Sequence, residues 1–335
     1  MTPNPIAAPT DSAELADMLE DRATRRADRR AFFKAAAGAA VAGAALGWAS
    51  AAEAQTVTDA DILNFALNLE YLEAQFYSFA VNGAGLGPTL LTGSGKQGAV
   101  TGGRAVDFSG DPIIGRMARE IAADEAAHVA YLRGQLGTAT VVAQPALDIS
   151  ASATGAFSKV AQAAGIVAAG VAFDPYASID NFLLAAYVFE DVGVTAYKGA
   201  APLITSKAYL EAAAGILAVE AYHAATLRTQ LFNRGQTNAN LITYAQGISD
   251  ARDSLDGATD IDQGITPGST TITNADATTT TLAVSNIVPT DQNAVVYSRT
   301  TGQVLNIAYI TSTAATVGGF FPAGVNGTIA TSTAE

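Results

Sequence analysis

Hydrophobic positions recur at helical spacing in four long segments of the chain. In the first, residues 58–82, Ile62, Phe65, Leu69 and Leu72 share one face of a helix. The other three segments end at turn-forming residues or a following proline and cover residues 112–137, 178–200 and 206–235. The pattern predicts four long helices, the first paired with the second and the third with the fourth.

The segments that join these helices differ in length and composition. Residues 83–111 are rich in Gly, Thr and Ser, which predicts a long surface loop. Residues 138–177 are interrupted by Pro145 and Pro175 and predict a connection with one or two short helices. Two helix pairs with a long link between them predict an all-α fold, a four-helix bundle with a long crossover connection.

The pattern changes after the fourth helix. A further helix is predicted over residues 238–255, followed by a Thr-, Gly- and Asn-rich stretch and two β-like runs around Thr301 and Gly302. The DIDQG motif at 260–264 lacks the remaining ligands of a calcium loop and is interpreted as a turn. Apolar residues continue to the end, so 236–335 is expected to wrap the bundle, which would occupy 55–235.

The N-terminus has the pattern of a targeting segment. Arg29 and Arg30 precede a small-residue apolar run at 35–49, and Ala52-Glu53-Ala54 forms a cleavage site. This resembles a twin-arginine export signal, so residues 1–54 are expected to be removed and the protein to reach the periplasm or cell envelope. The alternative is an uncleaved anchor, for which the run is short and weakly hydrophobic. After cleavage no integral membrane protein is expected.

The composition of the chain excludes some kinds of site and disfavours some kinds of partner. The chain of 335 residues has no cysteine, which excludes disulfides, thiolate metal ligands and a cysteine nucleophile. Its formal net charge of −13 disfavours nucleic acid and an anionic membrane surface as partners. Homo-oligomerisation remains open.

The two histidines of the chain occupy matching positions. His128 and His223 each follow a glutamate by three residues, Glu125 and Glu220, and each precedes the pattern Leu-Arg-x-Gln-Leu. A glutamate and a histidine at this spacing project from one helix face and can reach one cation. With 11 glutamates in the chain, the coincidence has a chance on the order of one in a thousand. The sequence therefore predicts two halves of a two-metal site.

Each half of the site needs one more carboxylate. We expect one from the first helix and one from the third, and we expect both to bridge the ions. Glu70 fits better than Glu73, because Tyr77 follows Glu70 by seven residues, as Tyr197 follows Glu190. Each tyrosine would lie two turns along the same face and hydrogen-bond a ligand carboxylate. The chain is then an internal duplication.

The other reading of a single Glu-x-x-His motif is an exposed ion pair. Against it, four carboxylates buried in a bundle core without a cation would be very costly. Glu73, Glu120 and Asp124 are expected to be solvated or to support the ligands from outside. Arg133 and Arg228 are each expected to pair with a carboxylate outside the site.

Four helices that contribute Glu, Glu-x-x-His, Glu and Glu-x-x-His resemble the ferritin-like superfamily of di-iron and di-manganese carboxylate proteins, over about residues 58–234. The stretches LNFALNLEYLEAQFY and GGFFPAG are similar to its exported ferritin-like and desiccation-related branch. The resemblance also implies that Glu125 binds a metal ion together with His128, and Glu220 together with His223. The resemblance implies six metal ligands: Glu70, Glu125, His128, Glu190, Glu220 and His223.

Two functions follow as expectations. In the first, two Fe or two Mn ions turn over O₂ or peroxide in oxidative-stress protection, as an iron oxidase or a manganese-catalase-like enzyme, with Tyr77 and Tyr197 beside the ligands. In the second, a non-catalytic desiccation-related envelope protein holds a structural metal pair. Access to the site separates the two. A storage cage fits less well, because the C-terminal extension would have to avoid the cage contacts.

Overall fold

The four predicted long helices form the centre of the molecule. The computed structural model describes residues 57–334, so the predicted export signal lies outside the described residues. Helix α2 packs along α3, and α5 packs along α6, which confirms the all-α bundle in two helix pairs. The bounds are α2 (Asp59–Asn82), α3 (Pro112–Thr140), α5 (Ile179–Ala200) and α6 (Lys207–Gly235).

Side-chain caps set where these helices begin. Thr58 and Asp61 form a reciprocal capping box at α2, and Asp111 caps α3 directly before Pro112. Gly83 then ends α2 in the left-handed conformation, with φ of 72°. Gly137 has φ of 66° inside α3 and breaks its regular geometry near the C-terminal end. The capping signals therefore place the helices almost where hydrophobic spacing predicts them.

The two long linking segments pair with each other. The loop after α2 contains the 3₁₀ helix η1 (Pro88–Leu90) and strand β1 (Val100–Gly102). Strand β1 runs parallel to β2 (Leu147–Ile149) of the crossover connection, which also contains the one short helix α4 (Ala156–Ala163). The loop is therefore anchored to the crossover. A second 3₁₀ turn, η2 (Ala201–Leu203), joins α5 to α6.

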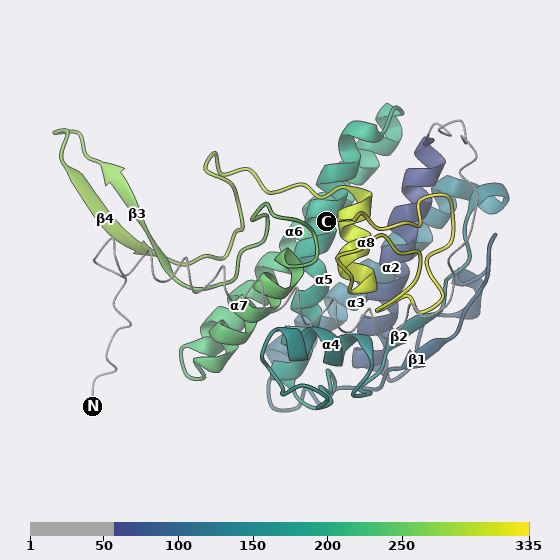
Figure 1. The fold of residues 1–335 in the computed structure, drawn as a ribbon, viewed down its shortest axis with the longest axis horizontal. Coiled ribbons are helices and arrows are strands. Elements are labelled where there is room, and N and C mark those ends of the chain that lie inside the picture. The colour runs from purple at the N-terminus through teal and green to yellow at the C-terminus, as the bar shows by residue number, and fades with distance from the viewer. Residues whose placement is uncertain (1–56, 335) are drawn as a thin grey trace.

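The C-terminal extension differs from its prediction in one part. Helix α7 (Asn240–Asp253) lies where a helix is predicted. The expectation of two β-like runs around Thr301 was wrong, because Thr300 and Gln303 form a capping box that starts helix α8 (Thr301–Tyr309). The strands lie earlier, in the Thr-rich stretch: β3 (Gly268–Thr273) and β4 (Thr279–Val284) form an antiparallel hairpin that projects away from the bundle (Figure 1).

The last part of the extension lies against α2 and α5 (Figure 1). The ring of Phe320 contacts Phe189 of α5 at 4.9 Å and Phe157 of α4 at 5.1 Å between centroids. The backbone N–H of Asn326 donates to the Asn68 side chain of α2 at 2.9 Å. Apolar stacking and hydrogen bonds therefore both attach this segment to the bundle.

A buried ion-pair network joins the extension to α5. Arg252 and Arg299 both donate to Asp262, at 2.7 and 2.8 Å, so the 260–264 turn is part of this network. Arg228 of α6 pairs with Asp191 at 2.8 Å, outside the predicted site. The prediction for Arg133 was wrong: this guanidinium donates to the Tyr71 hydroxyl and to backbone carbonyl oxygens rather than to a carboxylate.

Among residues 57–334, no helix combines the length and the apolar character needed to cross a membrane.

Candidate metal centre

The bundle brings all six predicted ligand residues to one buried point. Their potential ligand atoms fall into two overlapping groups, and within each group the atoms lie within 4.8 Å of one another. All six side chains are buried, and Glu125 and Glu220 are fully inaccessible to solvent. The first group is Glu70, Glu125, His128 and Glu220, and the second is Glu125, Glu190, Glu220 and His223.

Each histidine turns its Nδ1 atom toward this point. His128 Nδ1 lies 3.2 Å from Glu70 Oε2 and 3.6 Å from Glu125 Oε2. His223 Nδ1 lies 3.0 Å from the other oxygen of Glu125 and 3.5 Å from Glu190 Oε2. The two rings are 6.3 Å apart between centroids. A donor set of carboxylate oxygens and imidazole nitrogens around two adjacent points suits metal ions.

The bridging positions differ from the expectation. Glu125 and Glu220 belong to both groups, and the two oxygens of Glu125 face different histidines. Glu70 and Glu190, which were expected to bridge, each belong to one group only. The carboxylates of the Glu-x-x-His motifs therefore lie between the two points, since α3 and α6 place them at the centre of the bundle.

Each of the two predicted tyrosines bonds a glutamate of the other helix pair. Tyr77 donates a hydrogen bond to Glu190, and Tyr197 donates one to Glu70. The expectation that each tyrosine bonds the glutamate seven residues before it on its own helix was wrong, because seven residues of helix span about 10 Å. Both hydroxyls are instead held by the glutamate of the opposite helix.

Several polar atoms of the cluster have no hydrogen-bond partner in the described structure. They are both carboxylate oxygens of Glu125 and of Glu220, Oε2 of Glu190 and Nδ1 of His223. Buried carboxylates without donors are costly, and a bound cation removes that cost. The residues present therefore fit a metal centre.

The metal-free cluster shows what this burial does to the ionisation of its members. Burial and the neighbouring Glu70 raise the pKa of Glu125 to about 7. Burial by itself lowers the pKa of both histidines, but contacts with the glutamates outweigh it and raise the pKa to about 10 for His128 and about 12 for His223. Burial and neighbouring carboxylates also hold the pKa of Glu220 well above its usual range. Protons are thus held where a cation would otherwise balance the charge.

Three further residues belong to the site. Asp124 is partly exposed and lies 3.2 Å from Nε2 of His223, the nitrogen that faces away from the cluster, so it can fix the ring orientation. Glu73 is buried rather than solvated, at 6% exposure, and burial together with Glu125 raises the pKa of its carboxyl well above the usual range. Gly193 leaves room for a ligand: a Cβ atom there would lie 2.0 Å from Glu220 Oε2.

Gly193 and the burial of Glu73 were not predicted. A signal for both is present, because Glu73 follows Glu70 by three residues and Gly193 follows Glu190 by three residues. The duplication therefore has a carboxylate at one of two equivalent positions and no side chain at the other.

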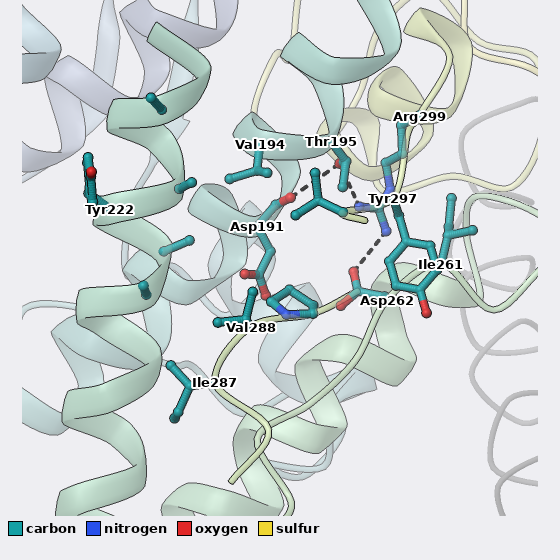
Figure 2. A pocket seen from close by; sticks show the side chains of 16 residues that line it. Asp191, Val194, Thr195, Tyr222, Ile261, Asp262, Ile287, Val288, Tyr297 and Arg299 are labelled. Carbon is teal, nitrogen blue, oxygen red and sulfur yellow. Dashed lines mark hydrogen bonds and ion pairs between the residues drawn. The ribbon is translucent and has the colours of Figure 1, made fainter. Parts of the chain in front are cut away.

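A larger cavity, of about 390 Å³, lies on a different face of α5 and α6. Asp191 and Thr195 of α5 line it, and Arg299 and Tyr297 of the extension lie across from them (Figure 2). Arg299 donates to Thr195 and to Asp262, as Figure 2 shows. None of the six predicted ligands lines this cavity.

Comparison with known proteins agrees with this geometry. The model of the ferritin-like domain family matches residues 58–233, the span of the four long helices. The chain is similar to the ferritin-like catalase Nec2 of Nesocodon mauritianus, with 28% identity over 280 residues, covering 81% of this chain and 85% of that protein. This match is longer than the family match, so it includes residues outside the bundle.

A second relative is the desiccation-related protein PCC13-62 of Craterostigma plantagineum. It is 33% identical over 206 residues, covering 59% of this chain and 62% of that protein, less than two thirds of its length. No solved structure matches the chain. The bundle, its buried glutamates and histidines, and the family match together show that the chain belongs to the ferritin-like domain family.

Proposed function

We propose that this protein binds two iron or two manganese ions in the cluster and disproportionates hydrogen peroxide. The observation that carries the proposal is the set of buried donor atoms without partners, arranged in two groups that share Glu125 and Glu220. When bound, such a metal pair supplies reversible changes of oxidation state.

The residues of the chain have separable tasks in this proposal. The four carboxylates would balance the charge of two divalent ions, and Glu125 and Glu220, which belong to both groups, would hold both ions. His128 and His223 each complete one group. Tyr77 and Tyr197 orient the glutamate that each of them bonds, so both ends of the site are held before substrate arrives.

Peroxide is favoured over O₂ as the substrate on two grounds. The relative with 28% identity is named a catalase, and its match extends beyond the bundle. Disproportionation also balances without a further reactant, since one peroxide is oxidised to O₂ while another is reduced to water. Turnover of O₂ would need a separate reductant, and no docking site for one is evident in the described residues.

The proposal places the protein in the periplasm or cell envelope, exported by the twin-arginine route, where it would protect against oxidative stress. That route carries folded proteins, which suits a chain that loads its metal before export. The support is the pattern of residues 1–54 alone. Oligomerisation is compatible with the proposal and is not needed for it, because one chain contributes all six ligands.

The test is direct. The mature chain from residue 55 is loaded with iron or with manganese, metal per chain is measured, and O₂ release from peroxide is followed with an electrode. We expect two ions per chain and O₂ release by one loaded form, with little by a Glu125→Ala variant. Loaded protein that releases no more O₂ than this variant would contradict the proposal.

One observation favours a second function. Glu125 and Glu220 are fully buried, and Phe76 of α2 packs against Phe182 and Phe189 of α5. A closed site suits a structural metal pair, and one relative is named a desiccation-related protein. In that case loaded protein would be inert toward peroxide, and removal of the metal would lower its melting temperature.

A further inference from the structure

A small cavity adjoins the candidate metal centre on the side covered by the C-terminal extension. Its volume is about 30 Å³, and it lies between α2, α5, α8 and the segment around Phe320. Most of its wall is apolar. The residues that matter here are Glu73, Val192, Gly193, Val304, Ala308 and Phe320.

Glu73 is the one acidic residue in that wall. Its side chain is buried, yet in the part of the chain that the structure describes no hydrogen bond or ion pair forms at its carboxyl group. It lies outside both four-residue ligand groups, although Glu220 and Glu125 are close enough to interact with it electrostatically. A carboxyl group that no protein group bonds, in the wall of a cavity, is available to a small polar ligand there.

Gly193 connects this cavity to the cluster. Because a Cβ atom at Gly193 would overlap Glu220 Oε2, at 2.0 Å, the shared carboxylate lies directly against the glycine that lines the cavity. A molecule in the cavity would therefore be next to the ligand carboxylates without displacing the helices.

We propose that this cavity is the substrate site of the metal centre and that Glu73 binds the substrate there by a hydrogen bond. The inference rests on the proposed function and names its substrate class. A cavity needs about 10–15 Å³ to hold one water molecule, so a cavity of about 30 Å³ has room for a molecule of two oxygen atoms. Hydrogen peroxide fits this space, and alkyl hydroperoxides exceed it.

In this proposal the C-terminal extension forms one wall of the substrate cavity. Val304 and Ala308 of α8, together with Phe320, form the wall that faces α2 and α5. The cavity is only partly enclosed, and without these side chains it would be wider, so that larger peroxides could enter. Size selection at this site therefore depends on residues that lie outside the four-helix bundle.

The first experiment fills the cavity. Ala308→Leu adds bulk at the wall, and Ala314→Leu makes the same change at an exposed position of the extension. In iron-loaded full-length protein, nitric oxide is the two-atom probe, titrated by visible absorption, and peroxide KM is measured in parallel. We expect Ala308→Leu to weaken nitric oxide binding and raise KM by tenfold or more at unchanged metal content, whereas Ala314→Leu behaves like the wild type.

The second experiment tests Glu73 and does not depend on how Ala308→Leu folds. Glu73→Gln keeps a hydrogen-bonding group and should hold KM within about threefold, whereas Glu73→Leu should raise it about tenfold, the effect of one lost hydrogen bond. Both variants should keep the metal content of the wild type. Equal KM values for the two variants would overturn the role of Glu73.

Two results would overturn the cavity itself: turnover of tert-butyl hydroperoxide as fast as hydrogen peroxide, or nitric oxide binding unaffected by Ala308→Leu. The failure of the proposed function looks different. Wild-type protein would then release no O₂ from peroxide, while the nitric oxide titrations would still report whether this cavity reaches the metal.

Discussion

Tyr77 donates a hydrogen bond to Glu190, although the candidate ligand on its own helix is Glu70. Tyr197 reciprocates by donating to Glu70. We expect Tyr77→Phe to lower metal affinity about tenfold to a hundredfold, because Glu190 loses the group that orients it. Competition with a chelator measures this. Tyr176→Phe is the control, since its hydroxyl bonds the Ile149 carbonyl away from the cluster. Equal losses in both variants would contradict the prediction.

The shared position of Glu125 predicts how metal is lost. Because Glu125 belongs to both groups, Glu125→Ala should deplete both ions, whereas Glu70→Ala should spare the ion held by Glu190 and His223. Elemental analysis should then give close to no ion per chain for the first variant and about one for the second, against two in the wild type. Identical metal content in the two variants would argue against the bridging assignment.

Gly193 offers a steric test. Gly193→Ala places a methyl group against Glu220 Oε2, so the carboxylate or α5 must shift, and metal binding should fall at least tenfold. Gly215→Ala is the matched control on α6, since nothing lies within 4 Å of its added methyl group, and it should stabilise the protein by about 0.5–1 kcal/mol. Chelator competition and thermal unfolding separate the two outcomes.

The buried network beneath the extension should matter more than an exposed pair. Arg299→Met leaves Asp256 and Asp262 without this partner in a buried setting, and we expect unfolding free energy to fall by about 3–5 kcal/mol. Arg104→Met removes a half-exposed pair with Asp174 and should cost about 1 kcal/mol or less. Urea denaturation of the two variants gives the comparison, and similar midpoints would refute the claim.

Metal-free protein should lose stability as the pH rises. Glu125, with a pKa raised to about 7, and His128, with a pKa raised to about 10, hold protons more tightly in the folded state than in the unfolded one. Their contributions are complete below pH 4.5 and 6.5, and they disappear as the pH passes the folded values. Unfolding free energy in chelator should therefore fall between pH 4.5 and 7 as Glu125 loses its proton and between pH 6.5 and 10 as His128 does, and bound metal should remove the decline. A flat profile without metal would contradict this.

The ligand positions could be predicted because the chain has two histidines, each with a glutamate three residues earlier. Helical periodicity then placed the remaining glutamates on the facing helices. The bridging roles could not be predicted, because they depend on how deeply each helix face is buried, and spacing along the chain does not contain that information. Gly193 was missed for a related reason, since its importance lies in the approach of Glu220 from another helix.

The extension was predicted less well than the bundle. The apolar run before Tyr309 has residues that favour strands, but the pair Thr300 and Gln303 caps a helix start and was the stronger local signal. The hairpin formed instead in a Thr-rich stretch whose strand residues are all exposed. Because neither face of the hairpin is buried, its sequence lacks the alternation of apolar and polar residues that predicts a strand.

The crossed hydrogen bonds of Tyr77 and Tyr197 mean that neither helix pair is self-sufficient. The tyrosine of each helix pair donates its hydrogen bond to a glutamate of the other pair. Reciprocal contacts of this kind are the mark of a twofold axis between identical partners. A single helix pair could complete the same arrangement only by associating with a second copy of itself. The fused chain has made that association permanent, so its two halves are free to diverge, as Glu73 and Gly193 have done.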